Sequence, residues 1–152
     1  MSLFDKFTKK ENKTFVPSSV LPAIIETLNQ AGYKAQRDTD VCVVYDDDGL
    51  YCYFWYSERD PEFLLAQVCF QRETIPTGSE LLLHQGCAKV NASQKAGKAY
   101  IDEKGDLMLT VEALIPYGSP IDRLALHMAK TLAATTAFFY LTYRDLTGDK
   151  TE

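Results

Sequence analysis

Residues 41–56 read VCVVYDDDGLYCYFWY, and this stretch decides the fold. Two runs of β-branched and aromatic side chains, residues 41–45 and 50–56, flank the acidic segment DDDG at residues 46–49. Such runs are typical of strands, and an Asp-Gly pair between them indicates a tight turn, because glycine accepts the positive φ that the turn requires. The stretch therefore predicts an antiparallel β-hairpin.

The hairpin also predicts which side chains share a face. Side chains alternate along a strand, so the length of the turn sets how the two strands combine their faces. With a turn of two or four residues, one face collects Val41, Val43, Tyr45, Cys52, Phe54 and Tyr56. The opposite face then collects Cys42, Val44, Tyr51, Tyr53 and Trp55. A turn of three residues would exchange the faces of one strand.

Both faces of this hairpin are apolar or aromatic, although an antiparallel sheet with helices on one side is usually polar on the other. Each aromatic side chain covers about 150–250 Å², so several exposed ones approach the patch size that marks a binding surface. Three explanations remain open: a helix of the same chain covers the second face, the chain associates with itself, or a partner or ligand binds there. The expected partner or dimer surface is Val44, Tyr51, Tyr53 and Trp55.

Helical spacing recurs in three segments outside the hairpin. Residues 18–32 and 121–144 carry apolar side chains at i, i+3 and i+4, and Gly32 is a typical helix stop. Ser79 is a suitable N-cap for a helix that reaches about residue 92. Its predicted apolar stripe comprises Leu81, Leu82, His84 or Gln85, Ala88 and residues 90–92.

Strand patterns fill the rest of the chain. They are predicted over residues 33–38, 63–72, 99–102 and 107–115. With the hairpin and the helices, the order is α-β-β-β-β-α-β-β-α. Strands that follow one another in hairpins, with helices set apart, predict an α+β fold in which helices pack on one face of an antiparallel sheet.

Length and composition agree with one domain. The chain has 152 residues, of which 46% are hydrophobic and 24% charged. A chain of this size buries a sufficient core without disulfides or metals. We expect a single domain over residues 18–145, a flexible N-terminal tail over residues 1–17 that contains four lysines, and a polar C-terminal tail over residues 146–152.

Charge and targeting signals exclude several partners. The net charge of −5 opposes a duplex nucleic-acid binder, which needs a basic face for the phosphates. Exposed aromatics could stack single-stranded bases, but no basic residues frame them. The sequence has no signal peptide and no transmembrane run. We therefore expect a cytoplasmic protein without nucleic-acid or membrane partners.

Motifs of catalysis and metal binding are missing. Cys42, Cys52, Cys69 and Cys87 have no zinc-type spacing and each lies in an apolar run, so we expect buried thiols and no metal or other cofactor. His84 and Cys87 are three residues apart on one predicted helix, but no third group orients them as a nucleophilic pair. No nucleophile, phosphate-binding or metalloprotease motif occurs, so the chain is not expected to be an enzyme.

The sequence also resembles a known family. Val90-Asn91, Tyr100-Ile101-Asp102 and Gly105-Asp106-Leu107 lie within an order of elements similar to that of the YbjN-type family of small bacterial proteins, sometimes labelled sensory transduction regulators. The resemblance covers residues 18–145. It implies a fold similar to type III secretion chaperones, which commonly dimerise and bind partner proteins without chemistry, and it supplies no active-site motif.

These observations together predict a non-enzymatic protein-interaction module that is chaperone- or adaptor-like, with a regulatory role left open. Its partner is another protein or a second copy of the chain, and a homodimer is the expected form. The alternative is a small-molecule-binding protein or an enzyme with an unrecognised site. A closed apolar pocket with convergent polar groups would favour that alternative.

Overall fold

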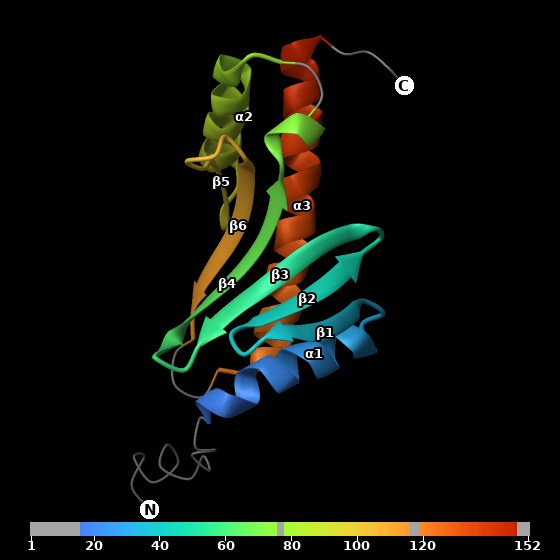
Figure 1. Ribbon diagram of the computed structural model, residues 1–152, viewed down its shortest axis with the longest axis vertical. Helices are drawn as coiled ribbons and strands as arrows, with labels where there is room; N and C mark the ends of the chain where they lie inside the picture. The colour runs from blue at the N-terminus through green and yellow to red at the C-terminus, as the bar shows by residue number, and fades with distance from the viewer. Residues whose placement is uncertain (1–15, 76–77, 116–118, 149–152) are drawn as a thin grey trace, which may run out of the picture.

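The structure, a computed structural model, describes residues 16–75, 78–115 and 119–148 (Figure 1). Of the predicted tails at residues 1–17 and 146–152, residues 1–15 and 149–152 lie outside the described residues, whereas residues 146 and 147 belong to the last helix. The elements in chain order are η2 (Pro17–Ser19), α1 (Val20–Gln30), β1 (Lys34–Thr39), β2 (Cys42–Asp47), β3 (Leu50–Ser57), β4 (Asp60–Phe70), η3 (Arg72–Thr74), α2 (Glu80–Ser93), β5 (Gly97–Ile101), β6 (Leu107–Leu114) and α3 (Ile121–Thr147).

All six strands belong to one antiparallel sheet with the order β1-β2-β3-β4-β6-β5. The predicted fold class and order of elements are confirmed. β1 and β5 are the edge strands. Figure 1 shows that the sheet is strongly twisted, so that β1, β2 and β3 run obliquely while β4 and β6 stand nearly parallel to α3.

The β2–β3 hairpin has the predicted register. Asp47 pairs with Leu50, so the turn consists of Asp48 and Gly49. Their φ values are 55° and 91°, and the side chain of Asp46 accepts a hydrogen bond from the Gly49 amide. A two-residue turn with two positive φ values matches the twist of the strands that it joins, which explains the DDDG sequence.

This register confirms the predicted division of the hairpin into two faces. Val43 pairs with Phe54 and Tyr45 with Cys52 on the buried side, and Val44 pairs with Tyr53 on the other. Val41 is the exception, because it lies in the turn before β2 and is 41% exposed. Val41 thus differs from the five other residues of its predicted face, which lie in β2 and β3 and are buried.

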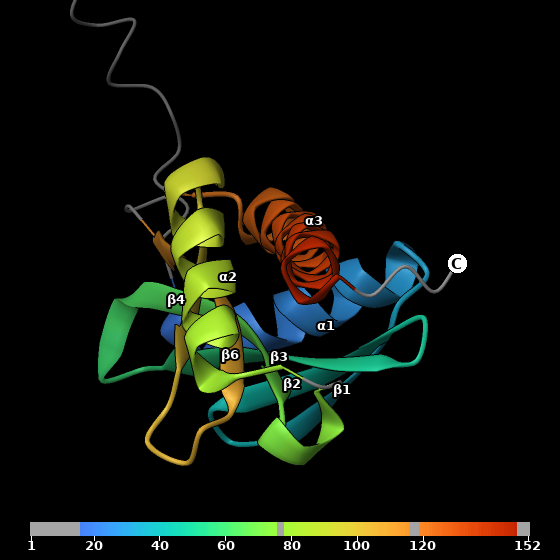
Figure 2. The same cartoon turned by 90° about the horizontal axis from the view of Figure 1, so that it is seen from above.

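The hydrophobic core lies on one side of the sheet. Side chains of α1, α2 and α3 form a single cluster with the buried face of the strands, and the cluster contains no side chain from the opposite face of the hairpin. Figure 2 shows α1 and α3 on the same side of β1, β2 and β3. Thus no described helix covers the second face, which removes the first of the three explanations for its apolar character.

The buried face of α2 differs from the predicted stripe. The buried residues are Leu83, Gly86, Cys87 and Val90, while Leu81 is 65% exposed. Ser79 caps the helix as predicted, with its side chain accepting from the Leu82 amide. The stripe was misplaced because small and polar residues on both sides of this helix leave little contrast between the faces.

Two glycines let α3 approach α2 and β5 closely. A Cβ atom at Gly97 on β5 would overlap the side chain of Thr135. At Gly86 on α2 a Cβ would lie 3.0 Å from the ring of Phe139. Phe139 in turn stacks on Tyr143, with ring centroids 5.7 Å apart. The second half of α3 is therefore held tightly on its α2 and β5 side.

Candidate interaction surface

The sheet face opposite the helices, here called the open face, presents side chains in rows across all strands. The register aligns one such row from edge to edge. It consists of Gln36, Val44, Tyr53, Gln67, Thr110 and Lys98, of which Thr110 is buried and does not reach the surface. The residues of this row on β2 and β3 are apolar or aromatic, and those on the other strands are polar. The open face is therefore apolar at β2 and β3 and polar towards the edge strands.

Val44, Tyr51, Tyr53 and Trp55 form the apolar part of this face, here called the aromatic strip. The rings of Tyr53 and Trp55 stack with centroids 6.4 Å apart and an interplanar angle of 27°. Tyr51 is 63% exposed and Trp55 is 38% exposed, while Val44 and Tyr53 are half-buried. The strip thus presents large side chains at the surface, and the stacking contact restricts the rings of Tyr53 and Trp55.

The apolar surface continues beyond the strip onto β4 and β6. Trp55 pairs with the half-buried Leu65, and Leu114 at the end of β6 is 75% exposed. A polar boundary follows, since Lys98 of β5 and Glu112 of β6 form a salt bridge of 2.8 Å. An apolar centre with a charged rim is the usual anatomy of a protein interface.

A shallow depression lies at the end of the strip. It has a volume of about 320 Å³, and Val41, Trp55, Phe63 and Leu65 are among its lining residues. The exposed Val41 thus belongs to this depression. Its walls are mostly apolar side chains, so the depression suits an apolar side chain of a partner.

The four residues predicted as a partner or dimer surface lie together on the open face. Cys42, the fifth residue of the same predicted face, is buried, and burial raises the pKa of its thiol to about 11. Cys42 therefore fills space beneath its neighbours. The sequence did not reveal Leu65 and Leu114, because the position of Leu65 beside Trp55 and of Leu114 beside Phe63 depends on the pairing of β3 with β4 and of β4 with β6.

The cysteines and histidines form no reactive pair. Cys87 is buried, and burial raises the pKa of its thiol to about 11, so the thiolate is scarce at neutral pH. His84 is exposed and lies 3.7 Å from Glu80. Among the described residues no group of His, Cys, Asp and Glu could hold a metal. The expectation that all four thiols are buried was wrong for Cys69, which is exposed on β4.

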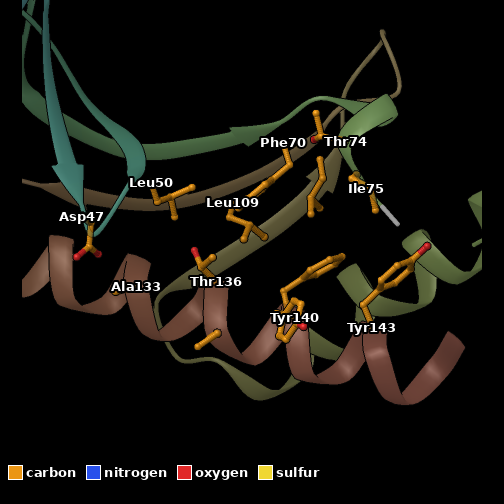
Figure 3. A pocket seen from close by; sticks show the side chains of 13 residues that line it. Asp47, Leu50, Phe70, Thr74, Ile75, Leu109, Ala133, Thr136, Tyr140 and Tyr143 are labelled. Carbon is orange, nitrogen blue, oxygen red and sulfur yellow. The ribbon is translucent and has the colours of Figure 1, made fainter. Parts of the chain in front are cut away.

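A second feature was missed by the sequence analysis altogether. A cleft of about 510 Å³, here called the α3 cleft, lies on the helical side of the sheet (Figure 3). Its main walls are Leu50, Phe70, Ile75, Ala133, Ala137 and Tyr140. The available signal was the pair of small residues four positions apart on α3, where a core helix normally presents large ones.

No family model matches this sequence, and no curated protein matches it either. Solved structures do match. An uncharacterized protein from Methanothermobacter thermautotrophicus aligns with a TM-score of 0.57 and 13% identity, over 83% of this chain and 97% of that chain. YbjN from E. coli aligns with a TM-score of 0.61 and 13% identity, over 82% of this chain and 93% of that chain. The fold is that of YbjN.

The resemblance to YbjN-type proteins is thereby confirmed at the level of the fold. A chain of the heterodimeric ExoU–SpcU complex from the type III secretion system of Pseudomonas aeruginosa aligns with a TM-score of 0.48 and 21% identity, over 74% of this chain and 94% of that chain.

None of the described helices is long and apolar enough to cross a membrane.

Proposed function

We propose that this chain is a non-enzymatic protein-interaction module, chaperone- or adaptor-like, that docks through its open face. The observation that supports this most is the stacked pair of Tyr53 and Trp55, which lies where no described helix covers the sheet. Tyrosine and tryptophan are the residues enriched at interaction hot spots. Because stacking already restricts the two rings, a partner would order them at little further entropic cost.

The proposed occupant of the open face is a second copy of the chain. Two sheets pack face to face about 10 Å apart when their inner faces are apolar. A two-fold axis through the aromatic strip would bury the strip of each copy against the other, as isologous dimers do. The Lys98–Glu112 pair would then lie at the rim, where charged groups remain hydrated.

This proposal assigns no catalytic step to the chain. The nucleophilic pair considered in the sequence, His84 and Cys87, combines an exposed imidazole with a buried thiol of raised pKa. Such a thiol is a space-filling group and a poor nucleophile. The role that we propose for the open face is therefore recognition of a protein surface.

The test is the oligomeric state measured by size-exclusion chromatography with light scattering across a concentration series. We expect the wild-type chain to be a dimer. Trp55→Glu and Tyr53→Glu place a charge in the centre of the interface, so each should raise the dimer dissociation constant at least about tenfold. The matched control is Leu81→Glu, since Leu81 is an exposed leucine of α2, a helix that packs with the core on the other side of the sheet.

Circular dichroism and thermal unfolding show whether each variant keeps its fold. A wild-type chain that stays monomeric at high micromolar concentration would contradict the dimer. Equal weakening by Leu81→Glu and Trp55→Glu would place the association elsewhere than on the aromatic strip.

A further inference from the structure

The α3 cleft is a groove along the second half of α3. The α3 residues that line it begin at Ala133 and end at Tyr143, about 15 Å along a helix axis. Figure 3 shows the β2–β3 hairpin, with Asp47 and Leu50, over one end of the groove and Ile75 over the other. Its volume of about 510 Å³ is within the range of small-molecule sites, roughly 300–1,000 Å³.

The cleft exists because the two sides of α3 differ in size. On one side, Gly86 and Gly97 allow the helix to lie close to α2 and β5. On the other side, Ala133 and Ala137 line the cleft with only a methyl group each. The sheet and the helix therefore diverge without large side chains to fill the gap.

The interior of the cleft offers a ligand few polar groups. The hydroxyl of Thr136 donates to the carbonyl oxygen of Leu132, and that of Thr74 donates to Gln71. Most of the remaining wall consists of aliphatic and aromatic side chains such as Leu109, Phe70 and Ile75. A molecule bound along the groove must therefore have an apolar body.

One end of the cleft carries the carboxylate of Asp47, the one acidic side chain among the described residues that line it. Asp47 follows Val43 and Tyr45 on the inward-facing side of β2, and Asp46 and Asp48 are its neighbours in the hairpin. The salt bridges among the described residues are His84–Glu80 and Lys98–Glu112, so none involves this hairpin. Burial, followed by the neighbouring carboxylates of Asp48 and Asp46, raises the pKa of Asp47.

We propose that the α3 cleft binds an amphiphile with an alkyl or aryl body and a protonated amine. The body lies along Ala133, Ala137 and Tyr140, and the ammonium group lies against Asp47. A carboxylate head group is excluded, because it would meet the like charge of Asp47. This site is on the opposite side of the sheet from the aromatic strip, so the inference does not depend on the proposed function.

Isothermal titration calorimetry with three probes of equal chain length tests the inference. Dodecylammonium, dodecanol and dodecanoate differ only in the head group, and each is used below its micelle or solubility limit. We expect dodecylammonium to bind about fivefold more tightly than dodecanol, as one partly exposed ion pair allows. Dodecanoate should show no binding at the same concentrations.

Two substitutions separate the body from the head group. Ala137→Phe should fill the groove and weaken both dodecylammonium and dodecanol at least about tenfold. Asp47→Asn should remove the preference for ammonium over alcohol and leave dodecanol unchanged. Glu58→Gln is the matched charge control, since it removes one negative charge from the β3–β4 turn and should leave all affinities unchanged.

Ala133→Leu serves as a second filling variant if Ala137→Phe does not fold, with circular dichroism as the criterion. Equal binding of dodecanoate and dodecylammonium would overturn the assignment of the head group. Unchanged affinity in the filling variant that folds, or the same loss in Glu58→Gln as in Asp47→Asn, would overturn the assignment of the site. Absence of binding by all three probes would overturn the proposal as a whole.

Discussion

Tyr45 is a core residue whose ring is well packed but whose hydroxyl group is not hydrogen-bonded to any described residue. Tyr45 is almost fully buried, between Tyr33 at a ring distance of 5.5 Å and Phe54 at 5.6 Å. Its hydroxyl has no hydrogen-bond partner among the described residues. Burial, followed by the neighbouring Cys52, raises the pKa of Tyr45 above its ordinary value, so the group stays neutral. The ring therefore contributes to stability and the hydroxyl does not.

We expect Tyr45→Phe to leave the free energy of unfolding unchanged or to raise it by up to about 1 kcal/mol, since it removes an unpaired buried polar group. Chemical denaturation monitored by circular dichroism measures the change. Tyr51→Phe, which removes an exposed hydroxyl, is the control and should have no effect. A loss of more than about 1 kcal/mol in Tyr45→Phe would show that the hydroxyl is bonded after all.

At the level of helices and strands, each edge strand of the sheet is attached to a helix by one asparagine side chain that makes two hydrogen bonds. Asn29 near the end of α1 donates to the carbonyl of Ala35 on β1 and accepts from its amide. Asn91 near the end of α2 makes the same two bonds with Ala99 on β5. Each asparagine thus anchors an edge strand to the helix that precedes it in the chain.

We expect Asn29→Ala and Asn91→Ala each to lower the free energy of unfolding by about 1–2 kcal/mol, which is the net worth of two hydrogen bonds. Because the two sites are at opposite edges, the double variant should show the sum of the two losses. Equilibrium unfolding in urea measures all three values. Gln30→Ala is the control, since Gln30 is adjacent to Asn29 but bonds only to Glu26 within α1. Losses no larger than that of Gln30→Ala would deny the asparagines this role.

At the scale of the whole molecule, we propose that residues 18–145 unfold as one domain. The cysteines report on this, because Cys42 and Cys52 lie in the β2–β3 hairpin and Cys87 lies in α2. All three are buried, whereas Cys69 is exposed. One hydrophobic cluster connects Cys52 and Cys87 through the core.

We expect a thiol reagent to modify Cys69 alone in the native protein. The other three thiols should become reactive only through global unfolding, with protection free energies equal within about 1 kcal/mol. Pulse labelling at increasing urea, with the modified sites identified by mass spectrometry, measures each value. Cys69→Ser controls for the native reaction, which it should abolish. Earlier labelling of Cys87 than of Cys42 and Cys52 would show that α2 belongs to a separate unit.

The sequence alone determined the hairpin, the division of its two faces and the order of the elements. These features are local, because they depend on alternation along a strand and on the turn that Asp48 and Gly49 can form. Such signals extend over a few residues and need no knowledge of the rest of the chain. The exposed position of Val41 escaped them, since β2 begins one residue later than the run of apolar side chains.

Only the tertiary structure decided which face of α2 is buried, which strands extend the apolar surface beside Trp55, and where a cleft remains. As a sequence signal Gly86 is unfavourable within a helix, yet its missing side chain makes room for Phe139, which belongs to a distant segment of the chain. Likewise, Ala133 and Ala137 do not stand out in the sequence, because alanine is common in helices. Their small size leaves a cleft only because the β2–β3 hairpin lines its opposite wall. Contacts between distant segments depend on the three-dimensional paths of both, and these paths are not encoded in the pattern of either segment.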